Sequence, residues 1–134
     1  NTYFSNDYLQ ESEYMPISNL IHRYKNKAVM LVTNQCACYC QFCTRQRITS
    51  NTDFSINNFE EIFHYIKEHS EIEDVLVSGG DPLVLSTATI VNILSELTKI
   101  SSVKIIRIGT RIPITLPQRV NTELIEELKK FNLV

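Results

Sequence analysis

The sequence lacks the features that would place the protein in a membrane or direct it across one. It has no apolar run of about 18 residues, which would indicate a transmembrane helix, and no secretory signal pattern. It also lacks a basic excess, because its formal net charge is -2. Proteins that bind nucleic acid usually carry a basic face. We therefore expect a cytoplasmic protein whose partners include neither a membrane nor a nucleic acid.

A second group of cysteines elsewhere in the chain is also missing. All four cysteines lie between Cys36 and Cys43, and Cys36, Cys40 and Cys43 form the pattern C-x3-C-x2-C. A structural zinc site usually draws its ligands from two separated pairs, which makes zinc the weaker interpretation. Three thiolates on one loop can instead hold three irons of a 4Fe-4S cluster and leave the fourth iron open. Burial of the cysteines as small apolar side chains is the other alternative.

Acidic residues are absent from the interval between Tyr14 and Thr52. In a chain of negative net charge, such a gap indicates that an anion is held nearby, and guanidinium groups suit both phosphate and carboxylate. A solvated basic surface is the alternative for Lys25 and Arg47. The basic residues of the interval are Arg23, Lys25, Lys27, Arg45 and Arg47.

The apolar residues that are present predict alternating strands and helices. Short runs rich in β-branched residues predict strands at 28–33, 74–78 and 103–108, and the last residues, 131–134, resemble the start of a fourth. Apolar residues at helical spacing predict helices over 59–66, 90–97 and 124–131. Their candidate N-caps are Ser55 or Asn57, Ser86 and Asn121.

This alternation predicts an α/β fold with parallel strands. Two architectures remain open at this point, an open doubly wound sheet and a closed or partly closed (β/α) barrel. Both place chemistry at the carboxyl ends of the strands, where the cysteines, the segment SGGDP and the segment GTRIP all lie. We expect residues 1–27 to form an N-terminal extension whose residues just before 28, including 17–24, are helical, and residues 28–134 to form the α/β domain.

The segment SGGDP follows the second predicted strand. Two glycines without side chains let a ligand approach the backbone closely, and exposed carbonyls there can accept hydrogen bonds from an ammonium group. A tight turn in which Asp81 caps the next helix is the alternative. Arg107, Thr110 and Arg111 follow or end the third strand, and either a ligand contact or a cap or ion-pair role fits them.

These motifs together resemble a known family. C-x3-C-x2-C after the first strand, with Phe42 before the last cysteine, resembles the signature of the radical S-adenosylmethionine (SAM) superfamily. More narrowly, HRYKNKAVMLVTNQC, CTRQR, VLVSGGDPL, RIGTR and LPQR resemble, in order, the lysine 2,3-aminomutase family over Leu20 to Leu128. Cys38 departs from that pattern, since the family commonly has a small residue such as serine there.

The resemblance implies the first half of an incomplete (β/α) barrel and a radical SAM amino acid 2,3-aminomutase that depends on pyridoxal 5'-phosphate (PLP). It implies that Cys36, Cys40 and Cys43 hold a 4Fe-4S cluster and that Arg45 binds the substrate carboxylate. Arg23, Tyr24 and Lys27 would contact the PLP phosphate, although Lys27 replaces the arginine usual in the family. The implied SAM-binding residues are Phe42, Ser78, Gly79, Gly80 and Asp81.

The resemblance also implies an amino acid substrate, a flavodoxin or ferredoxin as electron donor, and a possible homo-oligomer. The Schiff-base lysine of the family has no match in this sequence, so we expect a fragment of a longer chain that carries no catalytic residue of its own and is inactive alone. Two alternatives remain. One is the related enzyme that isomerises lysine for attachment to a translation factor, and the other is an iron-sulfur or zinc-binding module without SAM chemistry.

Overall fold

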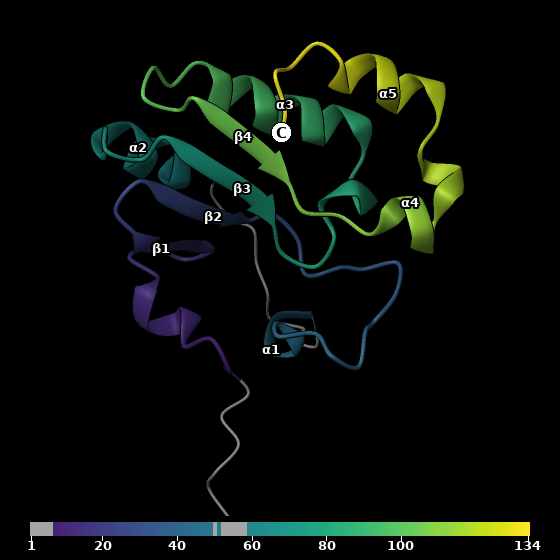
Figure 1. Ribbon diagram of the computed structural model, residues 1–134, viewed down its shortest axis with the longest axis horizontal. Helices are drawn as coiled ribbons and strands as arrows, with labels where there is room; N and C mark the ends of the chain where they lie inside the picture. The colour runs from purple at the N-terminus through teal and green to yellow at the C-terminus, as the bar shows by residue number, and fades with distance from the viewer. Residues whose placement is uncertain (1–6, 50, 52–58) are drawn as a thin grey trace, which may run out of the picture.

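The fold is built on a four-stranded sheet with the order β1-β2-β3-β4, as shown in the computed structural model of Figure 1. The structure describes residues 7–49, 51 and 59–134. The strands are β1 (Leu20–Tyr24), β2 (Lys27–Leu31), β3 (Asp74–Ser78) and β4 (Ile105–Ile108). β2, β3 and β4 are parallel, whereas β1 pairs antiparallel with β2 at the edge of the sheet.

The order of the strands agrees with the barrel, one of the two architectures that the sequence left open. Strands that neighbour one another in sequence also neighbour one another in the sheet, and no strand order is reversed. A doubly wound sheet reverses its order and carries helices on both faces, whereas a (β/α) barrel adds each strand beside the last. The predicted α/β fold, the early part of a partial barrel, is therefore confirmed.

The main core lies between one face of the sheet and three helices, α2 (Phe59–Glu68), α3 (Thr87–Thr98) and α5 (Thr122–Leu128). Side chains alternate between the two faces of a strand, so every second residue of β2, β3 and β4 points to these helices. The helices present apolar residues at the predicted spacing. The buried residues of this core include Ala28, Met30, Val75, Val77, Ile106, Ile62, Ile66, Ile90, Leu94 and Leu124.

Side-chain caps fix the beginnings of two of these helices. The Ser86 hydroxyl accepts a hydrogen bond from the Thr89 amide at 3.1 Å, at the start of α3. The Asn121 side chain accepts one from the Leu124 amide at 2.9 Å, at the start of α5. Both caps are confirmed predictions, because the first amides of a helix have no partner within it. Ser55 and Asn57, the candidates for α2, lie outside the described residues.

The helix predicted over residues 17–24 is wrong, because residues 20–24 form β1. Tyr24 pairs with Lys27, so Lys25 and Asn26 form a two-residue hairpin turn, for which asparagine is well suited. Leu20 packs into the main core and Ile21 packs on the opposite face. Because β1 buries apolar residues on both faces, its sequence shows no clear alternation, and this hid the strand.

The face of the sheet that points away from the main helices carries a smaller apolar cluster. Ile21, Leu31 and Ile48 form its centre, with Tyr14, Met15 and Val29 against them. Ile48 belongs to α1 (Gln46–Thr49), which follows the cysteines, and Tyr14 ends the 3-10 helix η1 (Glu11–Tyr14). This cluster therefore brings the N-terminal segment and the cysteine segment to the same face. The remaining short elements are η2 (Pro82–Val84), α4 (Ile112–Thr115) and η3 (Pro117–Arg119).

The last residues return to the sheet beside β4. Leu133 forms a parallel bridge with Ile106, and the Val134 amide donates to the Ile106 carbonyl at 3.0 Å. This is the beginning of a strand pairing that the sequence predicted. None of the helices that the structure describes is both long and apolar enough to cross a membrane.

The main core predicts a clear difference between two isoleucine substitutions. Ile66 on α2 is 0% exposed, so Ile66→Ala removes buried methyl groups and should lower the free energy of unfolding by about 2–5 kcal/mol. Ile114 is 78% exposed, and Ile114→Ala should change it by less than about 1 kcal/mol. Urea denaturation of both variants measures the difference. Equal losses would show that the core is not where the structure places it.

Candidate functional site

A pocket of about 780 Å³ lies at the carboxyl ends of the parallel strands. One wall is the cysteine loop, from Cys36 to Arg45, and the other consists of the turns that follow β3 and β4. Four motifs noted in the sequence thus meet in one place. From the turns, the pocket is lined by Ser78, Gly79, Gly80, Asp81, Gly109, Thr110 and Arg111.

The three cysteines of the C-x3-C-x2-C pattern are all partly buried, whereas Cys38 is exposed. All four are free thiols that line the pocket. Burial raises the pKa of the Cys36 thiol to about 11, and the negative charge of Asp81 and the other three cysteines add to this effect. Cys36 is therefore protonated at neutral pH, and a metal that binds it must displace that proton.

The glycine turn after β3 holds the start of the cysteine loop by backbone contacts. The Gly80 amide donates to the Thr33 carbonyl at 2.6 Å, and the Asp81 amide donates to the Gln35 carbonyl at 2.7 Å. A Cβ atom on Gly79, which has a φ of 126°, would lie 2.3 Å from the Thr33 oxygen. A Cβ atom on Gly80 would lie 2.2 Å from the Gln35 oxygen. Glycine is therefore required here by the neighbouring loop itself.

The carboxylate of Asp81 connects this turn to the end of β4. It is buried and accepts hydrogen bonds from the Leu83 amide at 3.0 Å, the Thr110 hydroxyl at 2.7 Å and the Arg111 amide at 2.7 Å. The capping role that the sequence offered as an alternative is thus present. Thr110 in turn accepts a hydrogen bond from the Ile112 amide at 3.0 Å. Among the backbone hydrogen bonds of turns and loops in the described part of the chain, none is donated to the carbonyls of Gly79 and Gly80, two residues that line the pocket.

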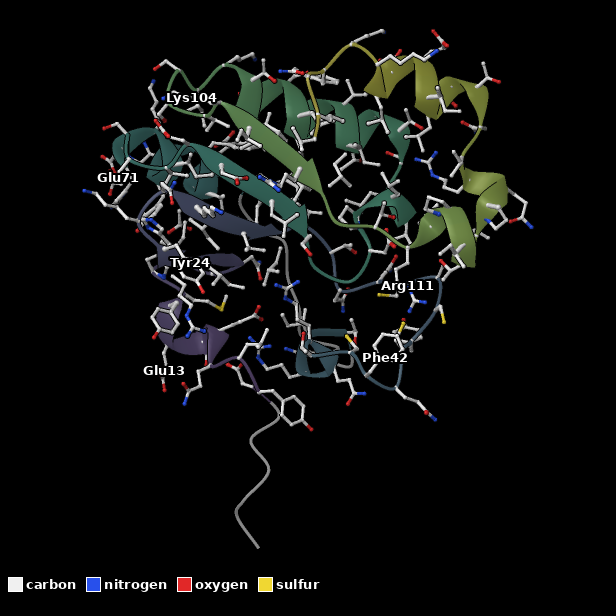
Figure 2. All side chains as sticks on the ribbon, in the orientation of Figure 1. Glu13, Tyr24, Phe42, Glu71, Lys104 and Arg111 are labelled. Carbon is white, nitrogen blue, oxygen red and sulfur yellow. The ribbon has the colours of Figure 1, made fainter. Side chains whose placement is uncertain are left out.

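Arg111 crosses the pocket to the cysteine loop. Its guanidinium donates a hydrogen bond to the Cys40 sulfur at 2.6 Å and lies 5.4 Å from the centre of the Phe42 ring. Figure 2 shows Arg111 and Phe42 side by side in this region. Phe42 is 77% exposed, so its ring is available to a ligand in the pocket.

Arg45 is held between two residues that are far from it in the sequence. Its guanidinium donates to the Ser78 hydroxyl at 3.0 Å and to the Glu11 carboxylate through two nitrogens, at 3.0 and 2.7 Å. Arg47 also donates to Glu11 at 3.3 Å and pairs with Asp7 at 3.5 Å. Arg47 therefore belongs to an ion-pair network with only 20% of its side chain exposed, and the alternative of a solvated basic surface is wrong for it.

Asp7 also holds the beginning of η1. Its carboxylate accepts hydrogen bonds from the amides of Glu11 and Ser12 and from the Ser12 hydroxyl, at 2.7–3.0 Å. Burial acts to raise the pKa of the Asp7 carboxyl, but the hydrogen bonds from Ser12 and Glu11 and the charge of Arg47 outweigh it and lower that pKa. Asp7 thus stays ionised and pairs with Arg47 in the neutral pH range.

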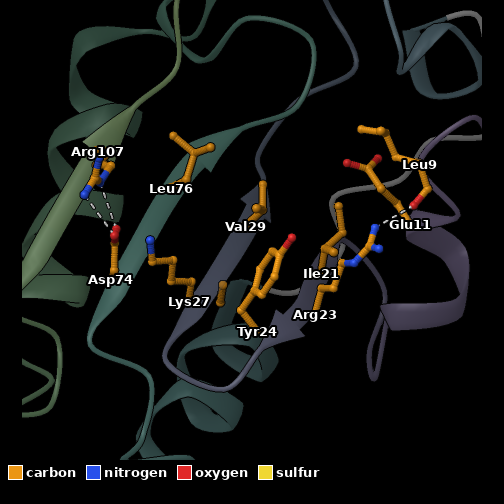
Figure 3. A pocket seen from close by; sticks show the side chains of 11 residues that line it. Leu9, Glu11, Ile21, Arg23, Tyr24, Lys27, Val29, Asp74, Leu76 and Arg107 are labelled. Atoms are coloured by element: carbon orange, nitrogen blue, oxygen red, sulfur yellow. Dashed lines mark hydrogen bonds and ion pairs between the residues drawn. The ribbon is translucent and has the colours of Figure 1, made fainter.

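A second pocket of about 380 Å³ lies on the face of the sheet away from the main helices. Figure 3 shows Arg23, Tyr24 and Lys27, from the end of β1 and the start of β2, together at one side of it. The Arg23 guanidinium donates to the Leu9 carbonyl at 3.2 Å and lies over the rings of Tyr14 and Tyr24. No ion-pair partner for Lys27 is found among the residues that the structure describes.

The two pockets lie at opposite ends of β2, since Lys27 begins this strand and the cysteines follow its end. Arg107 lies with the second pocket and not with Thr110 and Arg111. Its guanidinium forms an ion pair with Asp74, with hydrogen-bonding atoms 3.0 Å apart, so the ion-pair alternative describes Arg107. His64 lies 3.3 Å from Glu68 on the exposed side of α2.

The radical SAM superfamily matches residues 30–134, which include both the cysteine loop and the turns that face it. The chain belongs to this superfamily. Over 130 residues it is 42% identical to an L-lysine 2,3-aminomutase of Bacillus subtilis (strain 168), covering 96% of this chain and 28% of that protein. It is 39% identical over 130 residues to the L-lysine 2,3-aminomutase of Clostridium subterminale, covering 96% of this chain and 31% of that protein.

A glutamate 2,3-aminomutase of Clostridioides difficile (strain 630) is 40% identical to the chain over 121 residues, which are 89% of this chain and 29% of that protein. The chain thus spans less than a third of the length of the relatives described here. The likeness covers the cysteine loop, the glycine turn and Arg45 alike. The names of these relatives differ in the amino acid on which each acts.

The cysteine loop fits an iron-sulfur cluster of the radical SAM kind by its donor set. Among the described residues, no three cysteine, histidine or acidic side chains converge on one point as they would around a single metal ion. A structural zinc site takes four protein ligands, whereas a cluster with an open iron takes one thiolate at each of three irons. The pocket beside the thiols and the carbonyls of Gly79 and Gly80 leaves room for a ligand of the remaining iron.

Sequence reasoning missed Glu11 and Asp7, although a signal was present. The stretch without acidic residues begins just after Glu13, so the acids that neutralise Arg45 and Arg47 lie directly before it. Acidic residues just before a stretch that lacks them can neutralise its arginines. Here the short 3-10 helix η1 places Glu11 beside Arg45 and Arg47. The contacts of Glu11 confirm this pairing, with its side chain only 8% exposed.

The structure predicts that two glycine-to-alanine substitutions will differ in their effect on stability. Gly80→Ala places a methyl group 2.2 Å from a backbone oxygen, so this change should displace the cysteine loop and lower the free energy of unfolding by about 2 kcal/mol or more. Gly109→Ala meets its nearest atom, on the Leu76 side chain, at 3.5 Å and should be tolerated. Thermal or urea unfolding of the two variants measures both effects. If Gly80→Ala were as stable as Gly109→Ala, the contact between the two loops would be wrong.

Proposed function

We propose that the chain is part of a PLP-dependent amino acid 2,3-aminomutase that uses a 4Fe-4S cluster and SAM to move an amino group between neighbouring carbons. The observation that carries the proposal is the larger pocket, whose walls combine Cys36, Cys40 and Cys43 with the glycine turn and Arg45. The relatives named lysine and glutamate 2,3-aminomutase support the reaction class. Because the names of these relatives differ in the amino acid, the substrate class that we propose is an α-amino acid.

The cysteine loop would hold the cluster through Cys36, Cys40 and Cys43. When bound, SAM at the open iron supplies a 5'-deoxyadenosyl radical and PLP carries the migrating amino group. The carbonyls of Gly79 and Gly80, at the wall of this pocket, would accept hydrogen bonds from the ammonium group of SAM. Phe42 offers an apolar surface in the same pocket. Arg111 keeps its hydrogen bond to the Cys40 sulfur, a contact of the kind that tunes the potential of a cluster.

The basic residues would hold the two anions that the reaction brings in. Arg45 faces the larger pocket and would bind the substrate carboxylate by charge-assisted hydrogen bonds. Arg23, Tyr24 and Lys27 would bind the PLP phosphate at the smaller pocket. The Arg23 side chain is held by a hydrogen bond to the Leu9 carbonyl and by contacts with two tyrosine rings. Lys27 is exposed and would contribute a single point charge.

Asp81 has a supporting role in this proposal. Its carboxylate already accepts three hydrogen bonds, so it acts by holding Thr110 and Arg111 beside the glycine turn. Direct binding of SAM by its side chain stays a prediction. A one-electron donor of the flavodoxin or ferredoxin type and a cytoplasmic location are proposals that follow from the reaction class.

The cysteine assignment is tested by anaerobic reconstitution with iron and sulfide. The complete protein should take up about four irons per chain, and added SAM should change the EPR signal of the reduced cluster, because only an open iron can bind SAM. Replacing Cys36, Cys40 or Cys43 by Ala should abolish the cluster. Cys38→Ala is the matched control and should retain the iron. A cluster that does not respond to SAM would support a plain iron-sulfur module in place of the aminomutase.

The phosphate assignment is tested by a pair of lysine substitutions on one hairpin. Lys27→Ala removes a charge from the smaller pocket and should weaken PLP binding about 10-fold, the size expected for one hydrogen bond to a charged group. Lys25→Ala removes an equal charge from the neighbouring turn and should leave the affinity unchanged. Titration of the complete protein with PLP, followed by absorbance, gives both dissociation constants. Equal effects of the two changes would mean that only the general charge of the hairpin matters.

A further inference from the structure

Glu11 is a buried acid that no part of the proposed reaction requires. It lies in η1, and its side chain is only 8% exposed. Its carboxylate accepts hydrogen bonds from Arg45 and Arg47, which both follow the cysteine loop. A buried carboxylate is costly unless it is paired, so these contacts fix where η1 lies against the loop.

The hydrogen bonds of Arg45 use only some of the N–H groups of its guanidinium. A guanidinium has five N–H donors. Glu11 accepts from Nε and Nη2, which form the side edge of the group, and Ser78 accepts from Nη1. Two N–H groups remain, one on each terminal nitrogen, and no described residue accepts from them. A carboxylate can accept charge-assisted hydrogen bonds from such N–H groups.

Glu11 approaches Arg45 from behind the larger pocket. Arg45 lines the larger pocket, whereas Glu11 lines only the smaller one. Glu11 therefore does not occupy the position that a ligand of Arg45 would take in the larger pocket. Ser78, from the end of β3, holds the guanidinium from another side, and 19% of the Arg45 side chain remains exposed.

The charges of this network balance without a ligand. Glu11 and Asp7 carry two negative charges, and Arg45 and Arg47 carry two positive charges. Glu11 alone would weaken the attraction of Arg45 for an anion. Arg47, at 3.3 Å from Glu11, offsets this, and Asp7 completes the network on the side of Arg47. The network thus fixes the direction of Arg45 while Arg47 preserves much of its attraction for an anion.

We propose that Glu11 is a positioning residue that directs the remaining N–H groups of Arg45 toward the α-carboxylate of the substrate. The inference rests on the proposed function, since it takes Arg45 as the group that binds this carboxylate. It adds a role for the N-terminal segment, because Glu11 holds Arg45 while Leu9 and Tyr14 contact Arg23. One short segment thereby orients both arginines that we assign to anions.

The test compares ligands with and without an α-carboxylate. Isothermal titration calorimetry on the complete protein, loaded with PLP and without SAM, measures the binding of L-lysine against 1,5-diaminopentane and of L-glutamate against 4-aminobutanoate. The wild type should prefer at least one of the amino acids over the matching amine. Glu11→Gln leaves Arg45 without its charged partner and should lower that preference about 10-fold, with the affinity for the amine unchanged.

Glu13→Gln is the matched control. Glu13 lies on the same 3-10 helix and is exposed, and Figure 2 shows its side chain directed away from the protein. This change should leave the preference at the wild-type value. Glu11→Asp keeps the charge but shortens the side chain, and we expect an intermediate loss. Thermal unfolding of each variant identifies any that does not fold, and Glu11→Asp carries the test if Glu11→Gln is such a variant.

The other outcomes overturn the proposal in different ways. Tighter binding of the amino acid to Glu11→Gln would show that Glu11 competes with the substrate for Arg45. Equal losses for amino acid and amine would show a structural role alone. A wild type that binds neither amino acid would overturn the proposed function, and the inference with it, before any variant is compared. An unchanged preference in Glu11→Gln, with a normal wild type, would overturn the inference only.

Discussion

The structure depends on the backbone contact between the two loops that follow β2 and β3. The Gly80 and Asp81 amides donate to the Thr33 and Gln35 carbonyls at 2.6 and 2.7 Å, and glycine is the only residue whose lack of Cβ allows this approach. Because β2 and β3 are parallel, their carboxyl ends meet at one edge of the sheet. The contact then fixes the start of the cysteine loop against the turn that forms the opposite wall of the pocket.

The other contacts extend this arrangement outward along the sheet. Asp81 connects the glycine turn to Thr110 and Arg111 after β4, and Arg111 reaches back to the Cys40 sulfur. Arg119, in the LPQR segment, donates to the carbonyls of Leu83 and Leu85 at 3.1 and 2.9 Å. This arginine therefore supports the turn after β3, although its motif lies far along the chain. The pocket wall is stabilised mainly by hydrogen bonds between loops, while the apolar core on the far face supports the strands.

Ion pairs connect the N-terminal segment to the residues that follow the cysteines. Asp7 and Glu11 lie on one short segment and neutralise the two arginines that follow the cysteines. In the smaller pocket, Asp74 pairs with Arg107, which leaves Arg23 and Lys27 as the basic groups at its other side. Each pocket thus keeps positive charge at a defined place. This is what a site needs if it binds a carboxylate at one end of β2 and a phosphate at the other.

Local spacing and capping chemistry specify the strand at 74–78, most of the strand predicted at 103–108, the helices with their caps at Ser86 and Asn121, and the cysteine loop, so these could be predicted from sequence. Tertiary structure alone decided the rest. β1 was hidden because it buries Leu20 and Ile21 on opposite faces, and the choice between barrel and open sheet depended on the order of the strands. The partner of Arg45 could not be predicted from local pattern either, because Glu11 lies 34 residues away and reaches it only through the fold.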